Sequence, residues 1–318
     1  MTAGPSYTGA VALVDAIRRR IITSATSPFA HAPYPLAETL RYQGDPGLFG
    51  PGSVSWKVVG DVCTMVGGIR ALLIQSAHPE VVAGVADHSR YREDPLGRLS
   101  RTSAYVTATT FGAMPEVEEA VERVKRAHRR VVGMSHRGRP YSADASDLSA
   151  WVHNALTDSF LDAYVQFGRS PLTGDEADQF VAEQASIGRL LGADPLPETA
   201  AELRRWITEH QAVGPSPGMA GAVSFLTDPP LDGVGLKIGY RILQAGAVAT
   251  IPERLRDVLC IESFPGAQEA TRSLIAPLRW ALGSSPSWHL ALIRTGAPVP
   301  EGLFRQRLPV DPSSLRTA

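Results

Sequence analysis

The chain has 318 residues, 44% of them hydrophobic, so it can form one large domain or two modest ones with a substantial core. Its 31 Lys and Arg residues balance 32 Asp and Glu residues, which excludes a global charge suited to nucleic acid or acidic lipid. The two cysteines, Cys63 and Cys260, are far apart in the sequence. We therefore expect neither a disulfide framework nor a zinc knuckle, and a reducing compartment fits.

Neither of two apolar stretches predicts a membrane segment. The short run Ala10–Leu13 is followed by charged residues rather than preceded by them, which is the wrong order for a signal peptide. The most apolar window, Val58–Ala77, contains Asp61 and Arg70, and a bilayer span would have to bury both charges. The sequence predicts a cytoplasmic protein without a membrane span, in which this window forms core helices.

The first half of the chain reads as helices joined by irregular segments. We expect helices over residues 8–22, 56–66, 69–77, 79–87, 96–111 and 115–132. Gly67-Gly68 should break the second from the third, and residues 27–51, rich in Pro and Gly, should wrap around the body. The 115–132 helix has acidic residues early and basic residues late, which matches the helix dipole, and Val117, Val121 and Val124 share one side.

The second half continues the helical pattern. We expect helices over residues 148–167, 175–191, 200–210, 234–249, 252–260 and 265–282, with loops at 133–146 and 213–231. Asp147 is a candidate N-cap and Gly168 a candidate stop for the first of these, while Thr199 and Glu202 form a capping box. Strands do not alternate with helices, so the prediction is an all-α single domain. It divides into an N-terminal helix and wrapping segment (1–43), a helical domain (44–295) and a tail (296–318).

One hydrolase motif is present by spacing alone. Gly214-Pro215-Ser216-Pro217-Gly218 matches the Gly-x-Ser-x-Gly nucleophile elbow. That elbow needs a preceding strand and an N–H on the residue after the serine, and Pro217 has none. We therefore reject a serine hydrolase.

His153 is the histidine with the most informative context. It lies in the middle of the 148–167 helix, on the flank of an apolar stripe that includes Trp151, Phe160 and Tyr164. A neutral imidazole in an apolar interior must be hydrogen-bonded as a core residue, bound to a metal, or poised for proton transfer. His128, among arginines, is interpreted as solvated, and His210 has no supporting context.

A basic cluster follows the fourth predicted helix. In Arg98-Leu99-Ser100-Arg101-Thr102, Arg98 and Thr102 are four residues apart and share a helix face, with Arg101 at its edge. This face is either a solvent-exposed basic edge or a pocket wall whose donors hold an anion or an oxygen ligand. Upstream, Arg90 and Arg92 are candidates to bind acidic groups of a cofactor.

Several motifs, in order, resemble one family. They are Phe49-Gly50-Pro51-Gly52-Ser53-Val54-Ser55-Trp56-Lys57-Val58, Gly68–Pro79, His88–Pro95, Arg98-Leu99-x-x-Thr102 and Trp151-Val152-His153. Together they resemble the family that joins latex-clearing rubber oxygenases to the MpaB oxygenase of mycophenolic acid synthesis, long catalogued as a domain of unknown function. The resemblance covers roughly residues 44–290.

The resemblance implies a helical fold with a globin-like core that holds one non-covalent haem b, consistent with the absence of a Cys-x-x-Cys-His motif. By this resemblance His153 is the proximal iron ligand, and Arg98 and Thr102 are the distal polar pair, with Arg101 beside them. Trp151 and Tyr164 would line the haem slot, and Arg90 and Arg92 would serve its acidic groups. The implied partners are O₂ and a small hydrophobic substrate, with cleavage of a carbon–carbon double bond as the family's characteristic reaction.

One difference from the family limits which of its properties can be expected of this chain. Rubber-cleaving members carry a distal lysine that can ligate iron, whereas this chain has Arg101, whose guanidinium stays protonated and cannot coordinate. Two other readings stay open: a haem protein that binds gas without catalysis, and a helical protein without haem. The sequence leaves the substrate and the oligomeric state open.

Overall fold

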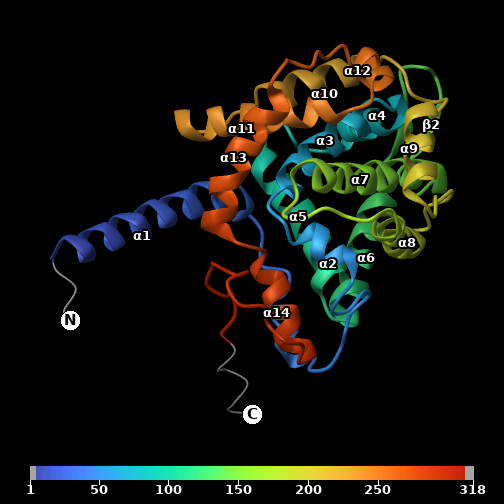
Figure 1. Cartoon of the computed structure of the whole chain (residues 1–318). Helices are drawn as coiled ribbons and strands as arrows, with labels where there is room; N and C mark the ends of the chain where they lie inside the picture. Colours follow the sequence, from blue (N-terminus) through green and yellow to red (C-terminus); the bar gives the residue numbers. More distant parts are fainter. Residues whose placement is uncertain (1–4, 312–318) are drawn as a thin grey trace.

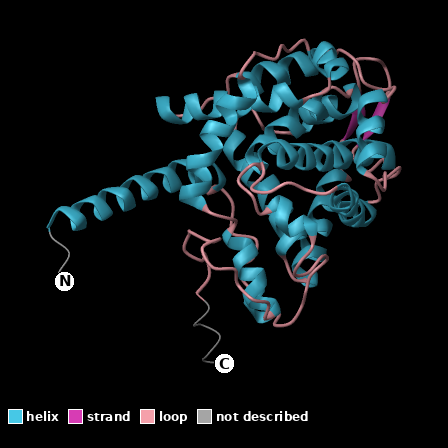
Figure 2. Cartoon of the chain, viewed as in Figure 1, coloured by secondary structure: helices cyan, strands magenta, loops and turns pink. Residues whose placement is uncertain are grey.

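The structure, a computed structural model, describes residues 5–311 and confirms the all-α prediction. Within those residues the chain forms fourteen α-helices, two short 3₁₀ helices and a single two-stranded hairpin. Figure 2 shows helix throughout the body, with strand only at one edge.

The helices α1 to α7 cover the first half of the chain. Their bounds are α1 Pro5–Thr26, α2 Val54–Val59, α3 Thr64–Ser76, α4 Pro79–His88, α5 Pro95–Phe111, α6 Met114–His128 and α7 Ser146–Phe167. The second half contains α8 Gly174–Leu191, α9 Ala200–Glu209, α10 Pro217–Thr227, α11 Val234–Thr250, α12 Glu253–Leu259, α13 Ala267–Leu282 and α14 Pro286–Thr295. The 3₁₀ helices η1 and η2 span Ser27–Phe29 and Thr39–Arg41.

Helix α7 lies at the centre of the molecule, where the apolar periodicity placed a buried helix (Figure 1). It packs most extensively on α3 and also contacts α8 and α9. Gly168 ends it, as predicted, but its N-cap is Ala145, and Asp147 lies in the first turn instead. Burial on nearly all sides explains why the helix carries so few charged residues.

The predicted break at Gly67-Gly68 is wrong, because α3 runs through both glycines. The interruption lies earlier, at residues 60–63, between α2 and α3. Gly67 instead permits close helix packing: a Cβ there would lie 2.7 Å from the Phe160 ring of α7. The glycine is therefore explained by the approach of α3 to α7, not by a turn.

Two strands and two helices were not predicted. Residues 133–146 were expected to be loop, but β1 Val132–Met134 pairs antiparallel with β2 Pro140–Ser142. Helices α10 and α14 start at Pro217 and Pro286, each directly after a serine whose side chain caps the helix. The cap of α10 is Ser216, so the rejected hydrolase serine has a structural role.

A buried ion network joins three helices behind the centre of the fold. Arg70 of α3, fully buried, donates to Asp158 Oδ2 at 2.7 Å and to Ser159 Oγ at 2.9 Å on α7. Arg204 of α9 binds the other Asp158 oxygen at 3.1 Å and also pairs with Asp162. The predicted reading of residues 58–77 as core helices is thus confirmed, because the charge of Arg70 is neutralised inside the protein.

A second buried arginine attaches the wrapping segment to the C-terminal helix. Arg294 of α14 donates to the Asp45 carbonyl, to Thr39 Oγ1 and to the Phe111 carbonyl. These acceptors come from the wrapping segment and from the end of α5. Arg294 therefore helps to hold residues 27–51 on the body, by satisfying oxygen atoms of both the wrapping segment and α5.

No helix among residues 5–311 is both long enough and apolar enough to cross a bilayer, as the sequence predicted.

Candidate functional site

The first half of α7 forms the wall of an aromatic cluster. The fully buried Trp151 donates its indole N–H to the Gln75 carbonyl of α3 at 3.2 Å. Its ring lies 4.8 Å from the His210 ring, 5.8 Å from Trp206 and 5.7 Å from His78. Because Trp206 and His210 are four residues apart, α9 presents both rings to Trp151 from one face.

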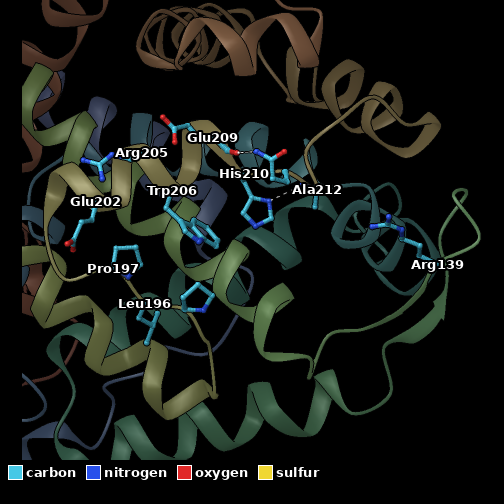
Figure 3. A pocket seen from close by; sticks show the side chains of 11 residues that line it. Arg139, Leu196, Pro197, Glu202, Arg205, Trp206, Glu209, His210 and Ala212 are labelled. Atoms are coloured by element: carbon cyan, nitrogen blue, oxygen red, sulfur yellow. Dashed lines mark hydrogen bonds between the residues drawn. The ribbon is translucent and has the colours of Figure 1, made fainter.

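A surface groove lies over this cluster, with a volume of about 840 Å³ (Figure 3). Trp206, His210, Leu196 and Pro197 form its apolar wall, and Arg139 reaches in from the hairpin on the opposite side. The remaining lining residues are Pro195, Glu202, Arg205, Glu209, Gln211 and Ala212. Asn154 of α7 donates to the Pro195 carbonyl at 3.1 Å, which fixes the groove floor on α7.

Two histidines with lowered pKa values lie at the back of the groove. Burial lowers the pKa of His78 to about 4, against the opposing effect of Glu80, whose carboxylate lies 3.4 Å from its Nδ1. Burial also lowers the pKa of His210, and its Nδ1 accepts the Ala212 N–H at 3.4 Å. That bond requires the tautomer with the proton on Nε2, so as placed His210 has no nitrogen lone pair for a metal.

His153 is buried, as predicted, but α8 closes around its ring. Nε2 lies 3.5 Å from Thr157 Oγ1, and the backbone of Gln184 supplies a further hydrogen bond. A Cβ on Gly188 would lie only 3.1 Å from Nε2. Burial lowers the pKa of His153 to about 4, so the ring is neutral. Asp158, one and a half turns further along α7, binds Arg70 and Arg204 and not this histidine.

This geometry is a test of the sequence-based ligand assignment. A ligand histidine would need open space beside Nε2 for the cofactor, whereas Thr157 and Gly188 both lie close to this atom. Neither of the two cavities described here is lined by His153. The surroundings of His153 are those of a hydrogen-bonded core histidine, and its assignment as the iron ligand stays a prediction.

The predicted distal residues lie on α5, away from α7. Arg98 is largely buried; its Nη1 donates to Ser89 Oγ at 2.9 Å and its guanidinium lies 5.8 Å from the Tyr91 ring. Burial lowers its pKa, against the effect of Tyr91. Thr102 is exposed and donates to the Arg98 carbonyl, and Arg101 is exposed and pairs with Asp94. No contact within residues 5–311 joins these side chains to His153.

A further side chain shares the face of Arg98. Tyr105 follows Thr102 by three residues, and its hydroxyl is buried without a hydrogen-bond partner within the described chain. Burial raises the pKa of this phenol. A buried hydroxyl without a partner costs roughly 1–3 kcal/mol, so its presence on this face indicates a group that it would bind.

His128 lies close to this end of α5. The last residue of α4, His88, binds the Val132 carbonyl at 3.0 Å just after α6, and the next residue, Ser89, binds Arg98. His128, the last residue of α6, is therefore brought to the same region as Arg98. It is half-buried rather than solvated, which corrects the sequence interpretation, and desolvation lowers its pKa.

The other predicted cofactor residues are dispersed. Arg90 is exposed and pairs with Glu93 at 2.9 Å, while Arg92 is exposed, 5.2 Å from the Tyr91 ring. Tyr164 lies thirteen residues beyond Trp151, about 20 Å along α7, and its hydroxyl contacts Ser170. The structure thus brings Trp151 to the groove and Arg90, Arg92 and Arg98 to the start of α5, but does not unite them with Tyr164.

The residues that sequence reasoning missed each carried a usable signal. The four-residue spacing of Trp206 and His210 indicated a shared helix face. His128 continues the stripe of Val117, Val121 and Val124 by one further turn. The contact of His78 with Trp151, by contrast, is a tertiary contact that no local pattern reveals.

Comparison with known proteins gives one match. Residues 56–280 match the family described as "ER-bound oxygenase mpaB/B'/Rubber oxygenase, catalytic domain". No curated protein and no solved structure matches significantly. The matched region begins in α2 and ends in α13, so it contains the groove, α5 and both candidate histidines.

Proposed function

Because the chain belongs to the MpaB and rubber oxygenase catalytic family, we propose that it is a haem b-dependent oxygenase acting on a hydrophobic small molecule. The family match over residues 56–280 carries the oxygenase part of this proposal. The haem part comes from the resemblance of the ordered set of motifs to this family, and from the polar face of α5. The unpaired cysteines, Cys63 and Cys260, support a cytoplasmic location.

We propose His128, rather than His153, as the protein donor to the iron. Its imidazole is neutral by desolvation and makes no side-chain hydrogen bond within the described chain. His128 ends α6, which packs on α5, the helix that carries Arg98 and Tyr105 as possible hydrogen-bond donors. Neither described cavity reaches these residues, so the cofactor would require the adjoining ends of α5 and α6 to separate.

The side chains of α5 would set the polarity around bound oxygen. The haem would supply a redox-active iron at which O₂ could be activated with electrons from a reductant, which no amino-acid side chain provides. Arg98 would contribute a fixed cation and Tyr105 a hydroxyl donor, both held in place by burial. Arg101 has no lone pair for the iron, so a resting state closed by a distal side chain is not expected.

The groove beside α9 is the proposed contact surface for the substrate. Its apolar wall of Trp206, Leu196 and Pro197 suits a hydrocarbon or an aromatic ring. Arg139, across the groove, forms no ion pair within residues 5–311 and would accept a polar end group. This arrangement favours a substrate that is mainly apolar with one polar terminus.

Oxygen uptake tests this function. With reductant and a panel of apolar alkenes, including isoprenoid alcohols, we expect substrate-dependent O₂ consumption and incorporation of ¹⁸O from ¹⁸O₂ into the product. Trp206→Ala should raise KM for the best substrate by up to about tenfold, since an aromatic contact is worth roughly 0.5–1.5 kcal/mol. Reductant oxidation that no substrate accelerates would contradict an oxygenase and favour a gas-binding protein.

A further inference from the structure

One side of the molecule exposes apolar side chains on three neighbouring helices. Eleven large hydrophobic residues are exposed in the described part of the chain, and six belong to α1, α11 and α13. They are Leu13, Val14, Ile17, Val234, Ile238 and Trp280. Isolated exposed apolar residues are ordinary, but a concentration on one side marks an interaction surface.

The two outer helices of this surface extend beyond the body. Figure 1 shows α1 and the first part of α11 projecting from the same side, with α13 between them. On α1, Leu13 is 62% exposed and Ile17 48%, and on α11, Val234 is 74% exposed. The second half of α11, by contrast, is buried against α3 and α13. The projecting segments therefore lack the partner that their apolar stripes would need.

Basic residues border the apolar stripe. Arg19 and Arg20 of α1 and Lys237 of α11 are exposed and form no ion pair within residues 5–311. Arg18 lies over the exposed Trp280 ring at 4.6 Å, which joins α1 to α13. The whole chain has a net charge of −1, so the positive charge is concentrated locally on this surface.

The charges on this surface favour an anionic lipid bilayer over a second copy of the chain as its binding partner. A second copy of the chain would bring its own basic residues on α1 and α11 against Arg19 and Arg20. Helix α11 has no acidic residue, and Asp15 of α1 is already paired with Arg18. An anionic lipid surface would instead neutralise the cations and accept Leu13, Ile17 and Val234 among its acyl chains. Trp280 has the amphipathic side chain favoured at the level of lipid headgroups.

We propose that the surface formed by α1, α11 and α13 docks the protein peripherally on anionic lipid bilayers. The apolar side chains of α1 and α11 enter the interface, and Arg19, Arg20 and Lys237 contact the headgroups. The docking is reversible and depends on salt, because it rests on exposed cations and a few apolar side chains. It concerns where the protein acts and is independent of the proposed oxygen chemistry.

Flotation of the full chain with lipid vesicles tests this proposal. We expect the protein to float with vesicles of phosphatidylcholine and phosphatidylglycerol, to stay behind with pure phosphatidylcholine, and to be released by 0.5 M salt. Leu13→Ser/Ile17→Ser and Arg19→Gln/Arg20→Gln should each weaken binding by about tenfold or more.

Matched control variants distinguish docking through this surface from nonspecific adsorption to lipid. Val165→Ser changes an equally exposed apolar residue on α7, and Arg129→Gln/Arg130→Gln changes a basic pair after α6; both should bind like the wild type. Absence of wild-type flotation, or equal losses in the controls, would overturn the proposal. So would a dimer in sedimentation analysis that Leu13→Ser/Ile17→Ser dissociates, because the surface would then bind a second copy.

Discussion

Replacing Asp158 with asparagine should destabilise the protein by about 3–5 kcal/mol, the cost of breaking a buried ion pair. The carboxylate binds fully buried Arg70 at 2.7 Å and Arg204 at 3.1 Å. Without it, Arg70 keeps only Asp162, at 3.6 Å, as a charged partner. Because Arg204 carries α9, the loss should also loosen the wall of the groove that holds Trp206 and His210.

Urea unfolding followed by circular dichroism measures this effect. The matched control is Asp228→Asn, which breaks the exposed ion pair with Arg241 at 3.2 Å and should cost less than about 1 kcal/mol. The buried variant should also lower Tm by roughly 10 °C, at 2–4 °C per kcal/mol for a domain of this class. An Asp158→Asn protein within about 1 kcal/mol of the wild type would show that the network does not stabilise the fold.

Substitutions of His128 and His153 should have different effects on haem binding and on stability. We expect His128→Ala to lower haem affinity by more than about 100-fold. Removing a residue that only hydrogen-bonds to a ligand lowers metal affinity roughly 10–100-fold, and removing the ligand itself should lower it further. Added imidazole should restore the absorption spectrum of that variant, because the side chain it replaces is the donor. His153→Leu should retain haem while losing stability, since the ring packs against α8 beside Gly188.

Titration of haem into each purified variant, followed by absorption, makes this comparison. His136→Ala, which removes an exposed histidine of the hairpin, serves as the control and should bind like the wild type. The assignment would be reversed if His153→Leu, folded by circular dichroism, lost haem and regained it with imidazole while His128→Ala bound normally.

Local patterns predicted most helices, and tertiary contacts explain the failures. The capping boxes begun by Thr173 and Thr199 form as their sequences indicate. Gly67-Gly68 was misread as a break because its cause, the ring of Phe160 on α7, is 93 residues away. The hairpin of two three-residue strands is too short to show an alternating pattern.

The candidate site was predicted less completely than the fold. The apolar stripe of α7 correctly placed His153 inside the protein, but periodicity says nothing about which helix faces it. Thr157 lies one turn further along α7, but the contact of the ring with Gly188 follows from the position of α8. For His128, the surrounding arginines suggested a solvated residue, although its turn continues the buried valine stripe of α6.

The absorption spectrum of the wild-type chain after reconstitution with haem tests the central claim most directly. If the protein is a haem b oxygenase, desalted samples should keep a Soret band at one haem per chain. That band should shift on reduction and shift again with carbon monoxide, showing that the iron has a position open to a gas. A folded protein that remains colourless after the same treatment would contradict the assignment of haem, and with it the oxygen chemistry proposed for α5.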